Sequence, residues 1–370
     1  MSIRCSRRAI IQGVGAAAAA SMVPAALATS ERRFEPRVGA WRTFEVTIEV
    51  TVADPQGTTR LWLPLPDVDT GYQRSLGNEW TGNATTVRQV TDPARATRML
   101  YAEFPPTVQQ PTIRLASRLQ TRDRSVDWQR PGRVREDRIV LRDCLAPTEW
   151  IPTDGIVRET ALAATRGATD DLAATRAIYR WVISNAHREP KVRGCGTGDV
   201  RTMLETGNLG GKCADLNAVF VGLCRAAGIP ARDVYGLRLA RSVFGYRELG
   251  ADPAKLTGAQ HCRAEVFLRQ YGWVAMDPAD VLKVMRQETK EWIHDPAHPL
   301  IAPVNEGLFG AWEGNWLAYN TAHDVLLPGS VGKLPLPFLM YPQGENQSGR
   351  FDELSPDAFR YSIHGRELSA

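Results

Sequence analysis

The first third of the chain alternates hydrophobic and polar positions in the way that half-buried strands do. Between Arg42 and Val52 every second residue is apolar, and this period of two predicts a strand. A second strand is predicted from Arg60 to Pro66, where prolines end it. Three more are predicted over 85–90, 96–104 and 112–121, separated by Asp, Gly and Pro. Residues 29–148 are therefore expected to form an antiparallel β domain of the sandwich type.

The pattern changes to helical spacing after Pro147. Segments Asp154–Arg166 and Asp170–Ala186 carry apolar residues three or four apart, and an acidic residue begins each. A short helix is predicted over 200–205, and a longer one over Cys213–Ala227, where glycine and proline follow.

Strands are predicted again over 233–239, 262–268 and 272–276. Residues 149–290 are thus expected to form a mixed α+β core. The remainder, 291–370, is rich in Pro, Trp and His, and is expected to be an extension packed on that core. Its aromatic residues Trp312, Trp316 and Tyr319 have helical spacing and are expected to be buried.

The N-terminus has the order of a signal peptide. Arg7 and Arg8 precede a weakly apolar stretch, and an Ala-x-Ala sequence ends at Ala28. Twin arginines are typical of a bacterial Tat signal, which exports folded proteins. Polar and helix-breaking residues interrupt the stretch, and a membrane span needs ~20 consecutive apolar residues. Residues 1–28 are therefore predicted to be cleaved, leaving a soluble protein in the periplasm or otherwise exported, without a transmembrane segment.

Net charge and composition narrow the classes of partner. The chain has 370 residues, 43% hydrophobic and 23% charged, which excludes a coiled coil or a largely disordered chain. The net charge is +4, and arginines of the leader supply three of these positive charges. The leader contains no acidic residue. The nearly neutral remainder offers no electrostatic footprint for nucleic acid.

Five cysteines remain after the leader, namely Cys144, Cys195, Cys213, Cys224 and Cys262. They form no Cys-x-x-Cys pair, so neither a zinc ribbon nor a thioredoxin motif is predicted, and we expect no metal or cofactor. An odd number leaves at least one thiol free within a single chain. Whether Cys195 and Cys262 form a disulfide is left open, because sequence does not establish proximity.

The sequence Gly210-Gly211-Lys212-Cys213 carries the first candidate chemistry. A glycine-rich loop before a helix can bind phosphate, but the P-loop pattern fails at two positions, Thr206 and Cys213. At a helix start, the partial positive charge of the N-terminus and Lys212 favour the thiolate of Cys213. Cys224, about three turns further along, is expected to be a core residue.

A nucleophilic cysteine needs a base, and His261 begins a predicted strand. Paired as a hairpin, this strand and the next bring His261 and Asp277 to the same end. A carboxylate in that place orients an imidazole. The order of Cys at a helix start, His at a strand start and Asp after the next strand makes these three residues the candidates.

Three blocks resemble the transglutaminase-like superfamily over about residues 149–280. They are Gly211-Lys212-Cys213-Ala214-Asp215-Leu216-Asn217 with its continuation through Arg232, His261 with Glu265-Val266, and Gly272-Trp273 with Asp277-Pro278. The resemblance implies a papain-like α+β fold and a catalytic triad. In that triad Cys213 is the nucleophile, His261 the general base and then acid, and Asp277 the residue that orients it.

Two departures separate the chain from animal transglutaminases. Ala214 stands where they have Trp after the nucleophile, and no Trp lies between Trp181 and Cys213. The predicted oxyanion hole therefore keeps one donor, the backbone N–H of Cys213, and its second donor is unidentified. These departures disfavour protein crosslinking.

The leading hypothesis is an exported cysteine hydrolase that cleaves amide bonds of a peptide or protein substrate through an acyl-enzyme. An acyltransferase, in which an amine replaces water, uses the same residues. A non-catalytic cell-envelope binding module is the third hypothesis, suggested by the β domain and the Trp-rich C-terminal region. The natural substrate and the oligomeric state stay open.

Overall fold

A computed structural model describes residues 32–66, 68–355 and 359–369. The compact unit begins at Arg32, and the predicted signal peptide, 1–28, lies outside the described residues. Within the described ranges, no helix is long and apolar enough to cross a membrane.

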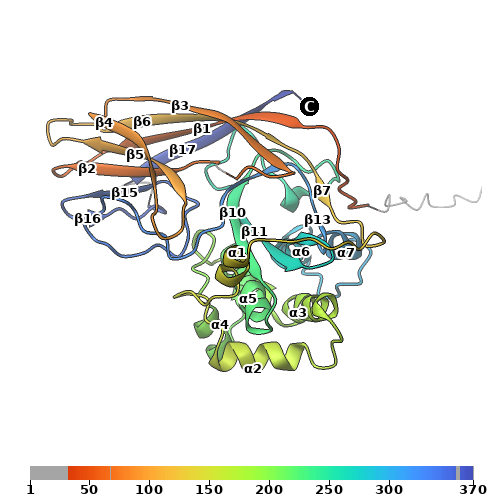
Figure 1. Ribbon diagram of the computed structural model, residues 1–370. Coiled ribbons are helices and arrows are strands. Elements are labelled where there is room, and N and C mark those ends of the chain that lie inside the picture. Colours follow the sequence, from red (N-terminus) through yellow and green to blue (C-terminus); the bar gives the residue numbers. More distant parts are fainter. Residues whose placement is uncertain (1–31, 67, 356–358, 370) are drawn as a thin grey trace, which may run out of the picture. The chain divides into compact units, whose positions relative to one another are not determined.

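The β-rich region is a sandwich of two antiparallel sheets (Figure 1). One sheet has the order β17-β1-β6-β3 and the other β16-β15-β2-β5-β4. Their strands are β1 (Arg42–Val52), β2 (Thr59–Pro64), β3 (Gln73–Gly82), β4 (Thr86–Thr91), β5 (Arg98–Phe104), β6 (Thr112–Thr121), β15 (Gln343–Asn346), β16 (Gly349–Arg350) and β17 (Phe359–Ser369). Alternate residues of β1, β2, β5 and β6 share one hydrophobic cluster, as the period of two predicts.

The second region is a four-stranded antiparallel sheet, β12-β11-β10-β14, packed with helices. Its strands are β10 (Ala231–Arg238), β11 (Gln260–Leu268), β12 (Gly272–Met276) and β14 (Trp316–Asn320). The helices are α1 (Arg138–Asp143), α2 (Gly155–Ala164), α3 (Asp171–Asn185), α4 (Val200–Thr206), α5 (Cys213–Ala226), η1 (Arg247–Leu249), α6 (Pro278–Gln287) and α7 (Ala302–Gly307). Two short sheets have two strands each. Strand β8 (His187–Arg188) pairs with β9 (Gly210–Gly211), and β7 (Arg124–Ser125) pairs with β13 (Ala311–Trp312). The predicted α+β class is confirmed.

Helix α5 is the centre of the second region. It packs against β10 and β11 and against helices α2, α3 and α6. All of its residues from Cys213 to Arg225 are buried, so the rest of the protein encloses this helix on nearly every side. Such surroundings hold its N-terminus in a fixed place, which matters for the residue that begins it.

The C-terminal segment contributes strands to both regions. Strand β14 pairs with β10, whereas β15 pairs with β2 and β17 pairs with β1. The aromatic residues Trp312, Trp316 and Tyr319 lie in or beside β13 and β14 and are buried. These residues are buried, as expected, but they lie in or next to strands although their spacing is helical. The domain boundaries at 148 and 290 stay a prediction.

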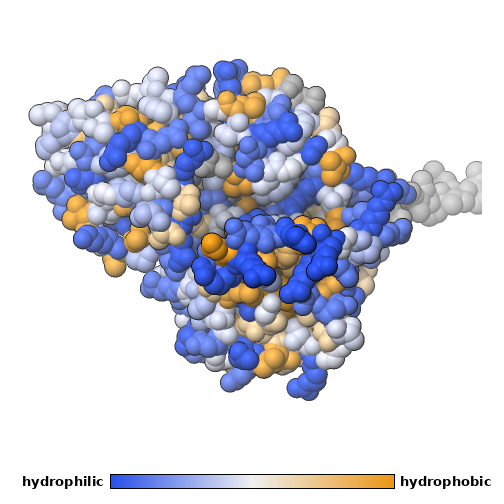
Figure 2. Space-filling model, viewed as in Figure 1, coloured by the Kyte–Doolittle hydropathy of each residue, from blue (hydrophilic) through white to orange (hydrophobic). Residues whose placement is uncertain are grey.

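Hydrophilic and hydrophobic residues are mixed over the surface. On the face drawn in Figure 2, hydrophobic residues form small groups among hydrophilic ones. Scattered exposed apolar residues of this kind are normal for a folded protein. Chemistry is therefore better sought among the buried polar groups of the α+β region.

Candidate active site

Cys213 is the first residue of α5, as predicted, and its side chain is buried. The carboxylate of Asp215 accepts a hydrogen bond of 3.0 Å from the backbone N–H of Lys212, which caps the helix. The N–H groups in the first turn of a helix have no acceptor within the helix. The thiol of Cys213 thus lies at a helix N-terminus, where the helix dipole favours a negative charge.

A second loop is tied to the same helix start. Asp215 also accepts hydrogen bonds from the N–H groups of Thr197 and Gly198, each 2.9 Å, and the N–H of Ala214 donates to Cys195 O at 3.0 Å. Gly196 has φ +89°, and a Cβ atom there would lie 1.8 Å from the Asp215 carboxylate. This loop therefore requires glycine, and it holds Cys195 beside the nucleophile.

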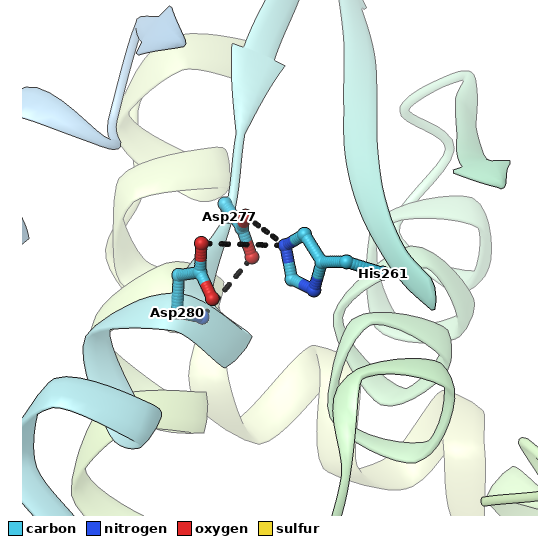
Figure 3. Close-up of side chains that lie close together, drawn as sticks. All are labelled: His261, Asp277 and Asp280. Carbon is cyan, nitrogen blue, oxygen red and sulfur yellow. Dashed lines mark hydrogen bonds and ion pairs between the residues drawn. The ribbon is translucent and has the colours of Figure 1, made fainter. Parts of the chain in front are cut away.

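The predicted hairpin brings His261 and Asp277 together. Strands β11 and β12 pair in antiparallel register with Ala264 opposite Met276, and Asp277 follows as the N-cap residue of α6. His261 Nε2 lies 2.8 Å from Asp277 Oδ2. Figure 3 shows the other ring nitrogen, Nδ1, pointing away from the carboxylates, which leaves it free to meet a thiol.

A second carboxylate on the same imidazole is a residue that the sequence analysis missed. Asp280 Oδ2 lies 3.3 Å from His261 Nε2 (Figure 3), and Arg238 forms a buried ion pair of 2.5 Å with Asp280 Oδ1. The backbone N–H of Asp280 donates to Asp277 Oδ1 at 3.1 Å. The capping pattern Asp277-Pro-Ala-Asp280 is the signal that points to this pair, because both acids fall in the first helical turn.

Asp277 is held by further polar groups. Asn217, one turn after Cys213 in α5, donates from Nδ2 to Asp277 Oδ1 at 3.3 Å and to Cys262 O at 2.9 Å. The guanidinium of Arg263 lies 3.7 Å from Asp277 Oδ2. These contacts fix the carboxylate between the helix and the strand that carry the other two candidates.

The three residues His261, Asp277 and Asp280 also have a geometry suited to a metal ion, since one ligand atom from each lies within 4.8 Å of the others. Two guanidinium groups already supply positive charge there. Arg238 pairs with Asp280, and Arg263 approaches Asp277. Because a cation in the same place would face these charges, the donor set fits a hydrogen-bonded network better than a metal site.

Cys213 and His261 line one cavity of about 390 Å³. Cys195, Gln260 and Tyr341 line it as well. Its size is that of a small-molecule or short-peptide site. The thiol that the sequence identified therefore opens onto space that a substrate can occupy.

Comparison with known proteins gives the family. The family model of the transglutaminase-like superfamily matches residues 158–278. An uncharacterized protein of Haemophilus influenzae is 34% identical over 327 residues, which cover 85% of this chain and 87% of that protein. The chain belongs to the transglutaminase-like superfamily. Members of this superfamily include cysteine hydrolases and acyltransferases, as the resemblance in the sequence implied.

Two solved structures resemble the chain to different degrees. A proposed cysteine protease of Cytophaga hutchinsonii has 13% identity and a TM-score of 0.50, and the likeness covers 89% of this chain and 99% of that one. The periplasmic domain of TgpA from Pseudomonas aeruginosa has 16% identity and a TM-score of 0.34, over 70% of this chain and 96% of that one. At such identities the first likeness shows the fold alone.

The electrostatics of this transglutaminase-like site favour a thiolate. The neighbouring thiols of Cys195 and Cys262, and then His261, hold the pKa of Cys213 well below its ordinary value, against the opposing effect of burial. Burial raises the pKa of Cys262, and Cys213 and then burial raise the pKa of Cys195, so these two thiols stay protonated. All the cysteines among the described residues are free thiols.

The imidazole is held as a cation in the same site. Burial and Arg238 lower the pKa of His261, but the carboxylates of Asp280 and Asp277 outweigh them and raise it to about 9. Arg238 and His261 keep the pKa of Asp280 well below its ordinary value although burial opposes them. The two shifts together favour a thiolate–imidazolium ion pair.

The pH dependence of alkylation tests this ion pair. We expect iodoacetamide to modify Cys213 with a half-maximal rate well below pH 8.5, the ordinary thiol value, because the thiolate persists there. A second rise is expected near pH 9, where His261 loses its proton and the thiolate becomes more nucleophilic. Asp280→Asn removes a negative charge beside the imidazole, so it moves the second rise to lower pH.

Asp295→Asn serves as the control, because Asp295 is exposed and does not line the cavity. The rates are measured by mass spectrometry of the peptide that contains Cys213, with circular dichroism to verify the fold. A single rise at about pH 8.5 would contradict the ion pair.

Proposed function

We propose that the protein is an exported cysteine-dependent hydrolase that cleaves amide bonds of peptide-like substrates with Cys213, His261 and Asp277. The observation that carries the proposal is a thiol of lowered pKa at a helix start, beside an imidazole fixed by buried carboxylates. The Cytophaga hutchinsonii protein of similar fold, described as a proposed cysteine protease, is consistent with this chemistry. Export rests on the leader, residues 1–28.

The proposed reaction has two halves. The Cys213 thiolate attacks the amide carbon, a C–S bond forms, and the carbonyl electrons move to oxygen. His261 gives its proton to the nitrogen as the C–N bond breaks, which releases the amine and leaves a thioester. Water then attacks the thioester while His261 accepts its proton, and the C–S bond breaks to release the acid and restore the ion pair. Asp277 and Asp280 stabilise the imidazolium in each half of the cycle.

The negative oxygen formed in the attack needs two donors. The backbone N–H of Cys213 is the first. For the second we propose the hydroxyl of Tyr341, which lines the cavity, lies against Cys195 and stays protonated, because burial raises its pKa. The sequence analysis left this position open, and no pattern in the C-terminal segment marks Tyr341.

Tyr341→Phe separates this role from a structural one. We expect kcat to fall about a hundredfold to a thousandfold, in line with the loss of one oxyanion donor. Alkylation of Cys213 by iodoacetamide passes through no oxyanion, so its rate is expected to change less than about threefold. Tyr319→Phe is the control, because Tyr319 is also a buried tyrosine but does not line the cavity. Equal losses in both assays would contradict the assignment.

Digestion of a peptide library, read by mass spectrometry, tests the hydrolase itself. New amide cleavage that is absent in Cys213→Ala supports the proposal, and a labelled primary amine added to the same reaction distinguishes transfer from hydrolysis. Label in the product favours the acyltransferase alternative. Failure of iodoacetamide to modify Cys213 faster than the other thiols would overturn the nucleophile.

A further inference from the structure

The cavity beside Cys213 carries an excess of positive side chains. Besides His261, its cationic lining residues are Arg188, Lys212, Arg238, Lys255 and Lys283. Asp252 is the one carboxylate in that lining. It accepts a hydrogen bond of 3.1 Å from the N–H of Ala254, and no ion pair involves it within the described ranges.

Two of the five cations have carboxylate partners. Arg238 pairs with Asp280 at 2.5 Å, and Lys283 pairs with Glu248 at 3.2 Å. The other three, Arg188, Lys212 and Lys255, form no ion pair in the part of the chain that the structure describes. Arg188 donates instead to the neutral amide oxygen of Gln287 at 3.1 Å. We call Arg188, Lys212 and Lys255 the anion subsite.

The fold holds two of these charges next to the nucleophile. Strands β8 and β9 pair in parallel with Arg188 opposite Gly211, and Lys212 lies between Gly211 and Cys213 in the chain. Burial lowers the pKa of Lys212, and the charge of Arg188 lowers it further. The charges of Cys195, Cys213 and Asp215 oppose this shift but do not outweigh it. A bound anion would therefore further stabilise the like charges of Arg188 and Lys212.

We propose that Arg188, Lys212 and Lys255 bind a carboxylate of the substrate, so that the enzyme cleaves acidic peptides whose carboxylate lies close to the scissile amide. The inference rests on the proposed function, because it places the carboxylate relative to the Cys213 thiolate. Guanidinium and ammonium groups bind carboxylates through charge-assisted hydrogen bonds.

Other features of the cavity favour a peptide over a polyanion. Leu354, Tyr341 and Tyr361 line the same cavity and offer apolar contact to the carbon chain of a peptide. The chain after the leader is nearly neutral, so it has no extended basic track for a phosphate backbone.

Two alkylating agents with the same leaving group test the subsite. In both iodoacetate and iodoacetamide the thiolate sulfur attacks the methylene carbon and iodide leaves, and only iodoacetate carries a carboxylate. We measure the ratio of the two rates, iodoacetate over iodoacetamide, at Cys213 and at glutathione. The ratio at Cys213 is expected to exceed that at glutathione by more than about tenfold, and to decrease with added salt.

Substitutions then test whether the preference of Cys213 for iodoacetate comes from the anion subsite or from the imidazolium of His261. Arg188→Gln and Lys255→Gln are each expected to lower the ratio about threefold or more. Lys290→Gln makes the same change of charge at an exposed lysine outside the cavity, and its ratio is expected to stay at the wild-type value. An unchanged ratio in the Arg188→Gln/Lys255→Gln double variant would overturn the subsite even if iodoacetamide modifies Cys213 rapidly.

Calorimetry tests the subsite without any thiol chemistry. Glutarate is expected to bind the wild-type protein at least about tenfold more tightly than glutaramide, its uncharged diamide, and the double variant is expected to lose this difference. Equal binding of the two compounds would overturn the anion subsite. Failure of Cys213 to react with iodoacetamide would instead overturn the proposed function, and calorimetry would still decide the subsite.

Discussion

Replacing Cys213 by alanine is expected to lower kcat/KM for a cleaved peptide by at least about 10⁴-fold, because the other thiol that lines the cavity, Cys195, stays protonated. Its thiol lies at the start of α5, and the neighbouring Cys195, Cys262 and His261 hold its pKa well below the ordinary value. Cleavage is followed by chromatography of the peptide identified in the library.

Cys224→Ala is the matched control for this change. It is the same substitution in the same helix, at a buried cysteine that burial keeps protonated. It removes one sulfur atom from the core and is expected to leave kcat/KM within about threefold of wild type. Peptide cleavage by Cys213→Ala at the wild-type rate would rule out catalysis by this thiol, whether or not Cys224→Ala retains its activity.

Replacing Arg238 by methionine is expected to lower the free energy of unfolding by about 3–5 kcal/mol, since it leaves a buried carboxylate without its partner. The side chains of Arg238 and Asp280 are 4% and 1% exposed, and their ion pair is 2.5 Å long. Arg238 also donates to Leu249 O at 2.9 Å. Urea unfolding followed by circular dichroism measures the loss.

Arg366→Met is the comparison for this prediction. Arg366 forms an ion pair of similar length, 2.8 Å, with Glu45, but its side chain is 66% exposed. Its loss is expected to cost less than about 1 kcal/mol, because water screens exposed pairs. In the double variant Arg238→Met/Asp280→Leu no charge is stranded, so we expect it to be more stable than Arg238→Met alone. Equal losses at Arg238 and Arg366 would contradict the importance of burial.

The sequence predicted best those elements whose pattern depends on residues that are neighbours along the chain. Strand β1 coincides with the predicted range 42–52, because its alternation of polar and apolar residues is a local signal. Strand β12 coincides with the predicted range 272–276. Strand β3 was missed, since its residues are largely exposed on both faces and show little alternation. Helix α6 was also missed, although Asp277 caps it and proline begins it.

The chain by itself determined the fold class, the family and the order of three candidate residues. Such features reside in periodicity and in short motifs, each set by neighbours along the chain. Cys213 at a helix start and His261 at a strand start needed no knowledge of distant contacts.

Tertiary structure alone decided what surrounds those residues. It placed Asp280 and Arg238 around the imidazole, Tyr341 at the cavity, and Arg188 beside Lys212. Each of these groups comes from a different element, and its effect depends on distance and burial, which a linear pattern does not contain. For the same reason, the sequence named a nucleophile and its base, whereas only the fold supplied the charges that set their pKa values.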